Sequence, residues 1–130
     1  MTFIDDLDMA SVGIARQAKR RAKRVALKAF EEINNESPVD NGTFRANWNV
    51  SIDTIDRSVD MEKDKKDYAE NTTKATAVIM GQALMGKTVY ISNSVPYATK
   101  LENGYSPQAP AGIVEPVVTR IKNAMATGQL

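Results

Sequence analysis

Segment 88–110 constrains the fold of this 130-residue chain most strongly, because it is dense in residues that limit the backbone. Apolar and polar side chains alternate over residues 88–92, which predicts a half-buried strand. Pro96 suits the first turn of a short helix, and Gly104 accepts the left-handed backbone that often ends one. Two prolines beyond Gly104 predict an extended stretch before the last helix. A segment so specified in shape, and so poor in catalytic groups, favours a protein that fits against other proteins.

The chain contains neither cysteine nor histidine. Disulfides, thiolate chemistry and the commonest general base are therefore excluded, and no nucleophile motif stands out among the remaining side chains. We expect no enzymatic activity, no cofactor and no bound metal. The net charge of +1 gives no strong overall attraction to nucleic acid. No apolar run reaches the length of a membrane span and no signal-peptide pattern opens the chain, so we expect folding in a cytoplasm without a membrane partner.

Hydrophobic periodicity predicts an α+β fold in a single domain over residues 1–130. An apolar period of 3.6 residues predicts one long helix over residues 3–36, and we expect one end of it to project or to pack on a neighbouring subunit. Alternation predicts strands over 46–55 and 88–92, in a small antiparallel or mixed sheet whose first strand has one wet face. Short helices and a C-terminal helix over 113–125 complete the prediction, with this last helix packed on the sheet.

Two segments carry no clear period. Residues 56–74 are polar and charged, which predicts a charged excursion or mobile loop. Its carboxylates could attract calcium, but the segment lacks the spacing and central glycine of a calcium loop, and its lysines would repel the cation. The tail, residues 126–130, is expected to fray.

Residues 81–88, G-Q-A-L-M-G-K-T, have the spelling of a phosphate-binding loop. That motif needs a strand before it and a helix that opens at its lysine. Here Lys87 instead begins a segment that alternates like a strand, and no later strand supplies an aspartate for magnesium. We therefore interpret residues 81–86 as the end of a short helix and its turn into a strand. A nucleotide hydrolase is the less favoured interpretation.

Seven basic residues and no acidic residue lie between positions 16 and 28. They could follow a phosphate backbone, which would make the chain a small nucleic-acid-binding module. No aromatic side chains interleave with them for base stacking, so we favour a solvated helix face or a partner for the acid-rich segment 53–70 of the same or a neighbouring chain. The side chains that would face DNA are Arg16, Lys19, Arg20, Lys23 and Arg24.

Two motifs resemble those of a known family. Residues 37–48, S-P-V-D-N-G-T-F-R-A-N-W, are similar to the motif S-P-V-D-T-G-x-L/F-R-x-N-W of phage neck or tail-completion proteins, the group that includes the minor tail protein Z type. Residues 91–104 are similar to that family's motif I-x-N-x-x-P-Y-A-x-x-L-E-x-G. The order of elements is also similar, and the resemblance spans most of residues 1–126. Asn41 stands where threonine is usual, and residues 56–74 do not align.

This resemblance implies a structural virion protein of the phage neck, assembled in the cytoplasm of the bacterial host. It implies a six- or twelve-fold ring of identical subunits around the DNA channel at the head–tail junction. The implied partners are copies of the chain itself, the adjacent phage connector and tail proteins, and, transiently, genomic DNA. The motif residues expected to shape contacts are Pro38, Asp40, Gly42, Phe44, Arg45, Trp48, Asn93, Pro96, Tyr97, Glu102, Gly104 and Tyr105.

Overall fold

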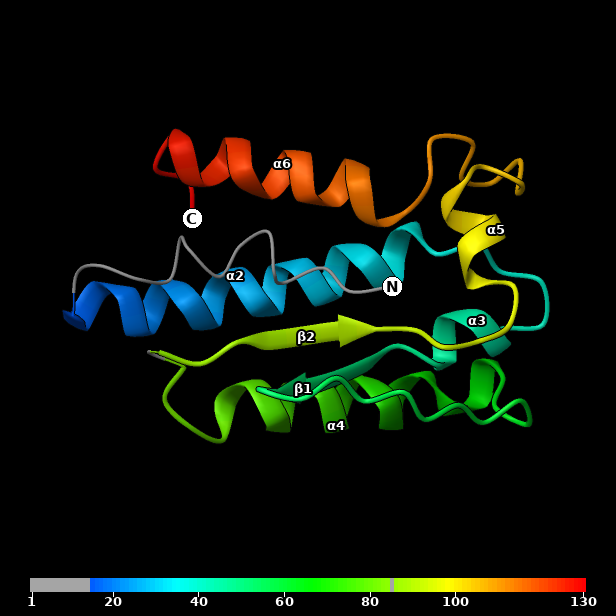
Figure 1. Ribbon diagram of the computed structural model, residues 1–130, viewed down its shortest axis with the longest axis horizontal. Coiled ribbons are helices and arrows are strands. Elements are labelled where there is room, and N and C mark those ends of the chain that lie inside the picture. Colours follow the sequence, from blue (N-terminus) through cyan, green and yellow to red (C-terminus); the bar gives the residue numbers. More distant parts are fainter. Residues whose placement is uncertain (1–14, 85) are drawn as a thin grey trace.

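A computed structural model describes residues 15–84 and 86–130 of the chain, with side chains described from residue 21 onward. Helices dominate, and a small sheet joins them (Figure 1), so the expected α+β class is confirmed. The elements are α2 (Ala15–Glu36), α3 (Thr43–Ala46), β1 (Asn49–Ile52), the 3-10 turn η2 (Lys65–Asp67), α4 (Tyr68–Met80), β2 (Val89–Ser92), α5 (Ala98–Glu102) and α6 (Val114–Ala126).

The sheet consists of β1 and β2, which pair antiparallel with Asn49 opposite Ser92 and Ile52 opposite Val89. Helix α4 packs on β1, while α2 contacts both α4 and α6. Figure 1 shows α6 alongside α2, with the sheet between α2 and α4. This arrangement places α3 and α5 together at one end of the molecule and the start of α2 at the other.

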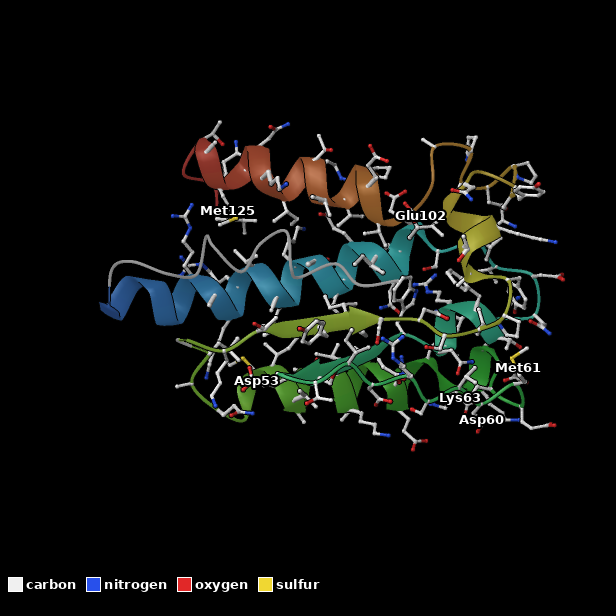
Figure 2. The ribbon with its side chains drawn as sticks, viewed as in Figure 1. Asp53, Asp60, Met61, Lys63, Glu102 and Met125 are labelled. Carbon is white, nitrogen blue, oxygen red and sulfur yellow. The ribbon has the colours of Figure 1, made fainter. Side chains whose placement is uncertain are left out.

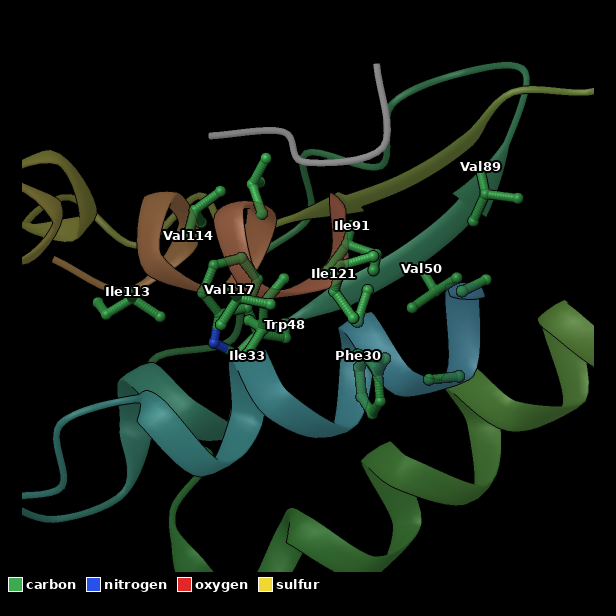
Figure 3. Close-up of a cluster of buried hydrophobic side chains, with 14 of the residues drawn as sticks. Phe30, Ile33, Trp48, Val50, Val89, Ile91, Ile113, Val114, Val117 and Ile121 are labelled. Carbon is green, nitrogen blue, oxygen red and sulfur yellow. The ribbon is translucent and has the colours of Figure 1, made fainter. Parts of the chain in front are cut away.

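The core lies between α2, the sheet and α6 (Figure 3). Its largest fully buried side chains include Trp48, Ile33 and Ile91. The stripe of α2 that faces the core is rich in alanine, because Ala22, Ala26 and Ala29 are all buried there. Small side chains let a neighbouring backbone approach closely, which suits a helix that is covered by two others.

The predicted long helix is confirmed from Ala15 to Glu36, and residues 3–14 lie outside the described residues. The first strand is shorter than predicted, since it covers only Asn49–Ile52 within the predicted range 46–55. A helical turn, α3, occupies the positions just before it. Asp53 ends the strand, because its backbone φ of 66° leaves the extended region.

The wet face predicted for the strand over residues 46–55 is wrong at Asn47, which lies just before β1 and is only 3% exposed. Its side-chain amide donates to the carbonyl oxygens of Thr43 and Asp60, at 2.7 and 3.0 Å. Its oxygen accepts the backbone N–H of Asp60 at 2.8 Å. A buried asparagine with these three bonds ties the following segment to the sheet, which alternation alone does not reveal.

Residues 56–74 are not one mobile loop, because residues 68–74 form the first half of α4. The buried face of α4 runs through Asn71, Ala75 and Ile79, spaced four residues apart. Asn71 donates from Nδ2 to the backbone oxygen of Trp48 at 3.1 Å. This buried polar residue takes a position where a hydrophobic residue would have marked the helical period, and the prediction failed for that reason.

The tail, residues 126–130, turns back toward α6 and the core. Gly128 adopts a φ of 78°, and the backbone N–H of Gln129 donates to the carbonyl of Ala124 at 2.8 Å, which closes the end of α6. Leu130 then packs against the core. The stretch before α6 also differs from prediction: it turns at Ala109 and again at Gly112, and does not run extended.

Candidate functional site

The two motif segments meet at the end of the molecule that holds α3 and α5, where they line a pocket of about 460 Å³. We call it the end pocket. It has contributions from the first motif, from the second motif, and from the segment between β1 and η2 (Figure 2, where Met61 marks that end). The lining residues are Pro38, Val39, Asp40, Asn41, Gly42, Thr43, Phe44, Met61, Tyr97, Leu101, Ser106 and Gln108.

The buried side chain of Trp48 anchors the first motif in the core. Its side chain is 1% exposed, and its Nε1 donates to Ser37 Oγ at 2.8 Å. Ser37 Oγ in turn donates to the carbonyl of Ile33 at 2.6 Å, in the last turn of α2. The motif therefore connects the end of a helix to the start of a strand, and Trp48 is a positioning residue that no partner can reach.

Asn93 joins the second motif to the first. It is 2% exposed, and its Nδ2 donates to the carbonyl of Phe44 at 2.9 Å. Its Oδ1 accepts the backbone N–H of Val95 at 3.1 Å. The Phe44 ring meets Trp48 edge-on, with centroids 5.5 Å apart, and lies 6.3 Å from the ring of Tyr97. Asn93 thereby fixes the floor of the end pocket and is itself inaccessible.

Glu102 caps helix α6 (Figure 2). Its carboxylate accepts the backbone N–H groups of Ile113, Val114 and Glu115, at 3.0, 2.8 and 3.2 Å. These donors have no partner within their own helix, and a negative charge is favourable at a helix N-terminus. The glutamate of the second motif thus fixes the direction in which α6 leaves the motif loop.

Gly104 ends α5 with a φ of 85°, and Tyr105 N–H donates to the carbonyl of Lys100 at 3.2 Å. A side chain at Gly104 would collide with the carbonyl oxygen of Pro110. The prediction that this glycine stops the short helix is confirmed. Pro96 lies in the turn just before α5 and is exposed.

Gln108 connects the two motif loops across the mouth of the pocket. Its Oε1 accepts the backbone N–H of Val39, and its Nε2 donates to the Val39 carbonyl, each at 2.9 Å. A side-chain amide that pairs with both backbone groups of one residue imitates a strand partner. The two loops are therefore held at a fixed spacing.

The remaining motif residues of the first loop also have internal contacts. Gly42 has a φ of 94°, and a Cβ at this position would lie 2.8 Å from the hydroxyl oxygen of Tyr68. The Arg45 guanidinium lies 5.0 Å from the centre of the Tyr68 ring and donates to Asn35 Oδ1 at 3.2 Å. Arg45 is half-buried, and it connects α3 to Tyr68 of α4 and to Asn35 of α2.

The accessible surface around the end pocket is aromatic and aliphatic. Tyr97, Met61 and Tyr105 are 36%, 49% and 73% exposed, which is unusual for side chains of this size. Burial raises the pKa of the Tyr97 hydroxyl, and the nearby Asp40 carboxylate raises this pKa further. Asp40 is exposed. Such a surface can bind another protein.

Two residues of the basic run donate hydrogen bonds to backbone carbonyls of other helices. Arg21 Nη2 donates to the carbonyl of Met125 at 2.8 Å, and Lys23 Nζ donates to the carbonyl of Met80 at 3.3 Å. These carbonyls lie at the C-terminal ends of α6 and α4, where a positive charge is favourable. Arg24 is exposed, while the side chains of Arg16, Lys19 and Arg20 lie outside the described ones.

The G-x-x-x-x-G-K-T segment does not have the surroundings of a phosphate-binding loop. A helix, α4, precedes Gly81 and a strand, β2, follows Thr88, so the predicted turn from helix to strand is confirmed. Lys87 Nζ lies 3.3 Å from Asp53 Oδ2, and Thr88 N–H donates to Asp53 Oδ1 at 2.9 Å. Lys87 and Thr88, just before β2, are thus bound to Asp53, just after β1.

Within residues 15–84 and 86–130, no three acidic, cysteine or histidine side chains gather where they could hold a metal ion. Nor does any helix in this part of the chain have both the length and the hydropathy to cross a membrane. No protein-family model, no curated protein and no solved structure matches the chain.

Proposed function

We propose that this protein is a structural component of the phage neck or tail-completion region, and that copies of it form a ring around the DNA channel at the head–tail junction. The observation that supports the proposal most is the meeting of both motifs at the end pocket. The residues that the motifs share with the family form two groups there. Trp48 and Asn93 are buried and position the loops, whereas Tyr97 belongs to the exposed surface.

The construction of the end pocket suits a docking role. Three separate contacts fix its loops: Gln108 on Val39, Asn93 on Phe44, and Glu102 on the start of α6. A loop that is ordered before binding loses little conformational entropy when a partner binds. A rigid surface with large exposed aromatic groups is therefore suited to repeated contacts between subunits of one assembly.

Deletion of the gene from the phage genome tests the proposal. We expect filled heads and separate tails in electron micrographs of the lysate, in place of joined virions. Supply of the wild-type chain from a plasmid should restore joined particles. Joined, infectious particles formed without the chain would contradict the proposed function.

A matched pair of variants then tests whether the end pocket is the surface that matters. Tyr105→Ser removes a side chain that is 73% exposed beside the second motif, and we expect it to restore few joined particles. Met80→Ser removes a side chain that is 50% exposed at the far end of α4, and we expect it to restore them fully. Equal rescue by both variants would exclude the end pocket as the contact surface.

A further inference from the structure

The end pocket has one charged side chain among its lining residues, the carboxylate of Asp40. Asp40 is exposed, and it takes part in no ion pair within the described part of the chain. The walls beside it are the rings of Phe44 and Tyr97 and the flexible side chain of Met61. A lone carboxylate between aromatic and thioether walls suits a cationic side chain, whose alkyl stem packs on the walls while its head meets the carboxylate.

Two neighbours of Met61 add to this negative charge. Asp60 and Glu62 are exposed on either side of it, and neither has an ion-pair partner among the described residues. Lys65 lies next to Gly42, yet it also makes no ion pair there. None of these three carboxylates, of Asp40, Asp60 and Glu62, forms an ion pair within the described part of the chain.

The outer face of α2 presents the opposite charge. Arg24 and Lys28 are exposed and lie one helical turn apart. Lys28 has only a 4.0 Å contact to Glu31, and Arg24 has no acidic partner among the described residues. The acid-rich segment 53–70 pairs instead with Lys66 and Lys87, so it does not neutralise this helix face within the chain.

The two surfaces lie far apart on one molecule. Arg24 is in the first half of α2. Helices α3 and α5, which contribute residues to the end pocket, lie beyond the opposite end of α2 (Figure 1). The twelve residue steps from Arg24 to Glu36 alone span about 18 Å at the helical rise. A contact between these surfaces therefore joins two copies, head to tail, which is the kind of contact that generates a ring.

We propose that the end pocket receives the basic outer face of α2 from the next copy of this chain, with Asp40 of one subunit paired with Arg24 of its neighbour. This inference rests on the proposed ring and names its subunit contact. Each copy uses its pocket once and its basic face once, so every interface in the ring has the same ion pair. Charge complementarity then determines that the end pocket of one subunit contacts the basic face of α2 in the next.

Reciprocal charge reversal tests the pairing. Asp40→Arg alone brings two cations together at every interface, and Arg24→Asp alone brings two carboxylates together. We expect native mass spectrometry at low ionic strength to show about a tenfold loss of rings for each variant, because like charges at an interface are strongly unfavourable. An equimolar mixture should restore rings in which the two variants alternate, since half of the interfaces then pair the two wild-type residues and the other half pair the two reversed ones.

Control variants separate this pairing from a general effect of charge. Lys122→Asp and Lys74→Asp reverse exposed charges on α6 and α4 at residues that belong to neither surface, and we expect both to assemble like the wild-type chain. Urea unfolding of each variant shows that the fold is intact.

Rings that survive both single reversals, or a mixture that stays disassembled although each variant is folded, would overturn the pairing. A wild-type chain that remains monomeric at low ionic strength would overturn it as well. The gene-deletion experiment decides the proposed function separately, so the two failures can be told apart.

Discussion

Asp53 shows how one side chain can end a strand and close a sheet. It is the one non-glycine residue with a positive φ among the described residues, and its carboxylate accepts the Thr88 N–H while it pairs with Lys87. The hydrogen bond from Thr88 lowers the pKa of Asp53 most; burial opposes this, and Lys87 lowers the pKa further. Lys87, the lysine of the G-x-x-x-x-G-K-T segment, thus contributes to the stability of the fold.

This lowered pKa predicts the pH dependence of stability. A carboxyl whose folded pKa lies below its unfolded value, near 3.9, stabilises the fold above that value. The contribution is lost as the pH falls through the folded pKa. We therefore expect the urea concentration at the unfolding midpoint of the wild-type chain to decrease when the pH is lowered below about 4. This decrease should be smaller in Asp53→Asn, which keeps an oxygen acceptor but no charge. A matched control is Glu62→Gln, and identical pH profiles for wild type and Asp53→Asn would contradict the assignment.

Gly104 allows a second test of a single residue. Alanine there must adopt a left-handed backbone and also collide with the Pro110 carbonyl, so we expect Gly104→Ala to lower the free energy of unfolding by about 2 kcal/mol. Gly86→Ala is the matched control, because Gly86 has a φ of 72° but a Cβ added there would meet no atom within 4 Å. We therefore expect Gly86→Ala to lower the free energy of unfolding less than Gly104→Ala does. Equal losses for the two variants in chemical denaturation would show that the collision with the Pro110 carbonyl is relieved.

Among the elements, those with a regular period were predictable and those with a polar residue in the buried face were not. Strand β2 and helix α6 follow from the alternation and the helical spacing of their apolar residues. Helix α4 does not, because Asn71 occupies its buried face. The order of the tail also depends on a bond from Gln129 to Ala124 and on Leu130 reaching the core, and neither is a property of local sequence.

Helix α6 is the element whose position depends most clearly on one distant side chain. Removal of the carboxylate in Glu102→Ala leaves three N–H donors at its start without this acceptor, and we expect a loss of about 1–2 kcal/mol in the free energy of unfolding. Amide hydrogen exchange at Ile113 and Val114 should become faster than in the wild-type chain. Glu62→Ala, at an exposed position, is the control, and unchanged exchange in Glu102→Ala would contradict the capping role.

At the scale of the whole molecule, the sequence identifies most of the candidate site by its motifs but not its geometry. The motifs contain Asp40, Phe44 and Tyr97, which the fold brings to one pocket. Met61 carries no recognisable signal, since it comes from the charged segment, and the contact of Gln108 depends on a bond across 69 positions. Sequence spacing cannot reveal such contacts, because they depend on how the elements pack.

The same scale shows a molecule with two different ends. One end has the pocket with its carboxylate, which has no ion-pair partner in the described part of the chain, and the other has the basic half of α2. Two unlike and complementary ends are what a closed ring of identical subunits requires, because each interface joins one surface to the other. The function we propose is therefore geometric: the chain acts by its shape and by its contacts with copies of itself.

Quantitative mass spectrometry of purified virions from cells that carry the gene tests this claim most directly. We predict that each joined particle contains the chain in a fixed copy number, about six or twelve, which matches one closed ring of identical subunits. Complete absence of the chain from infectious particles would contradict the claim.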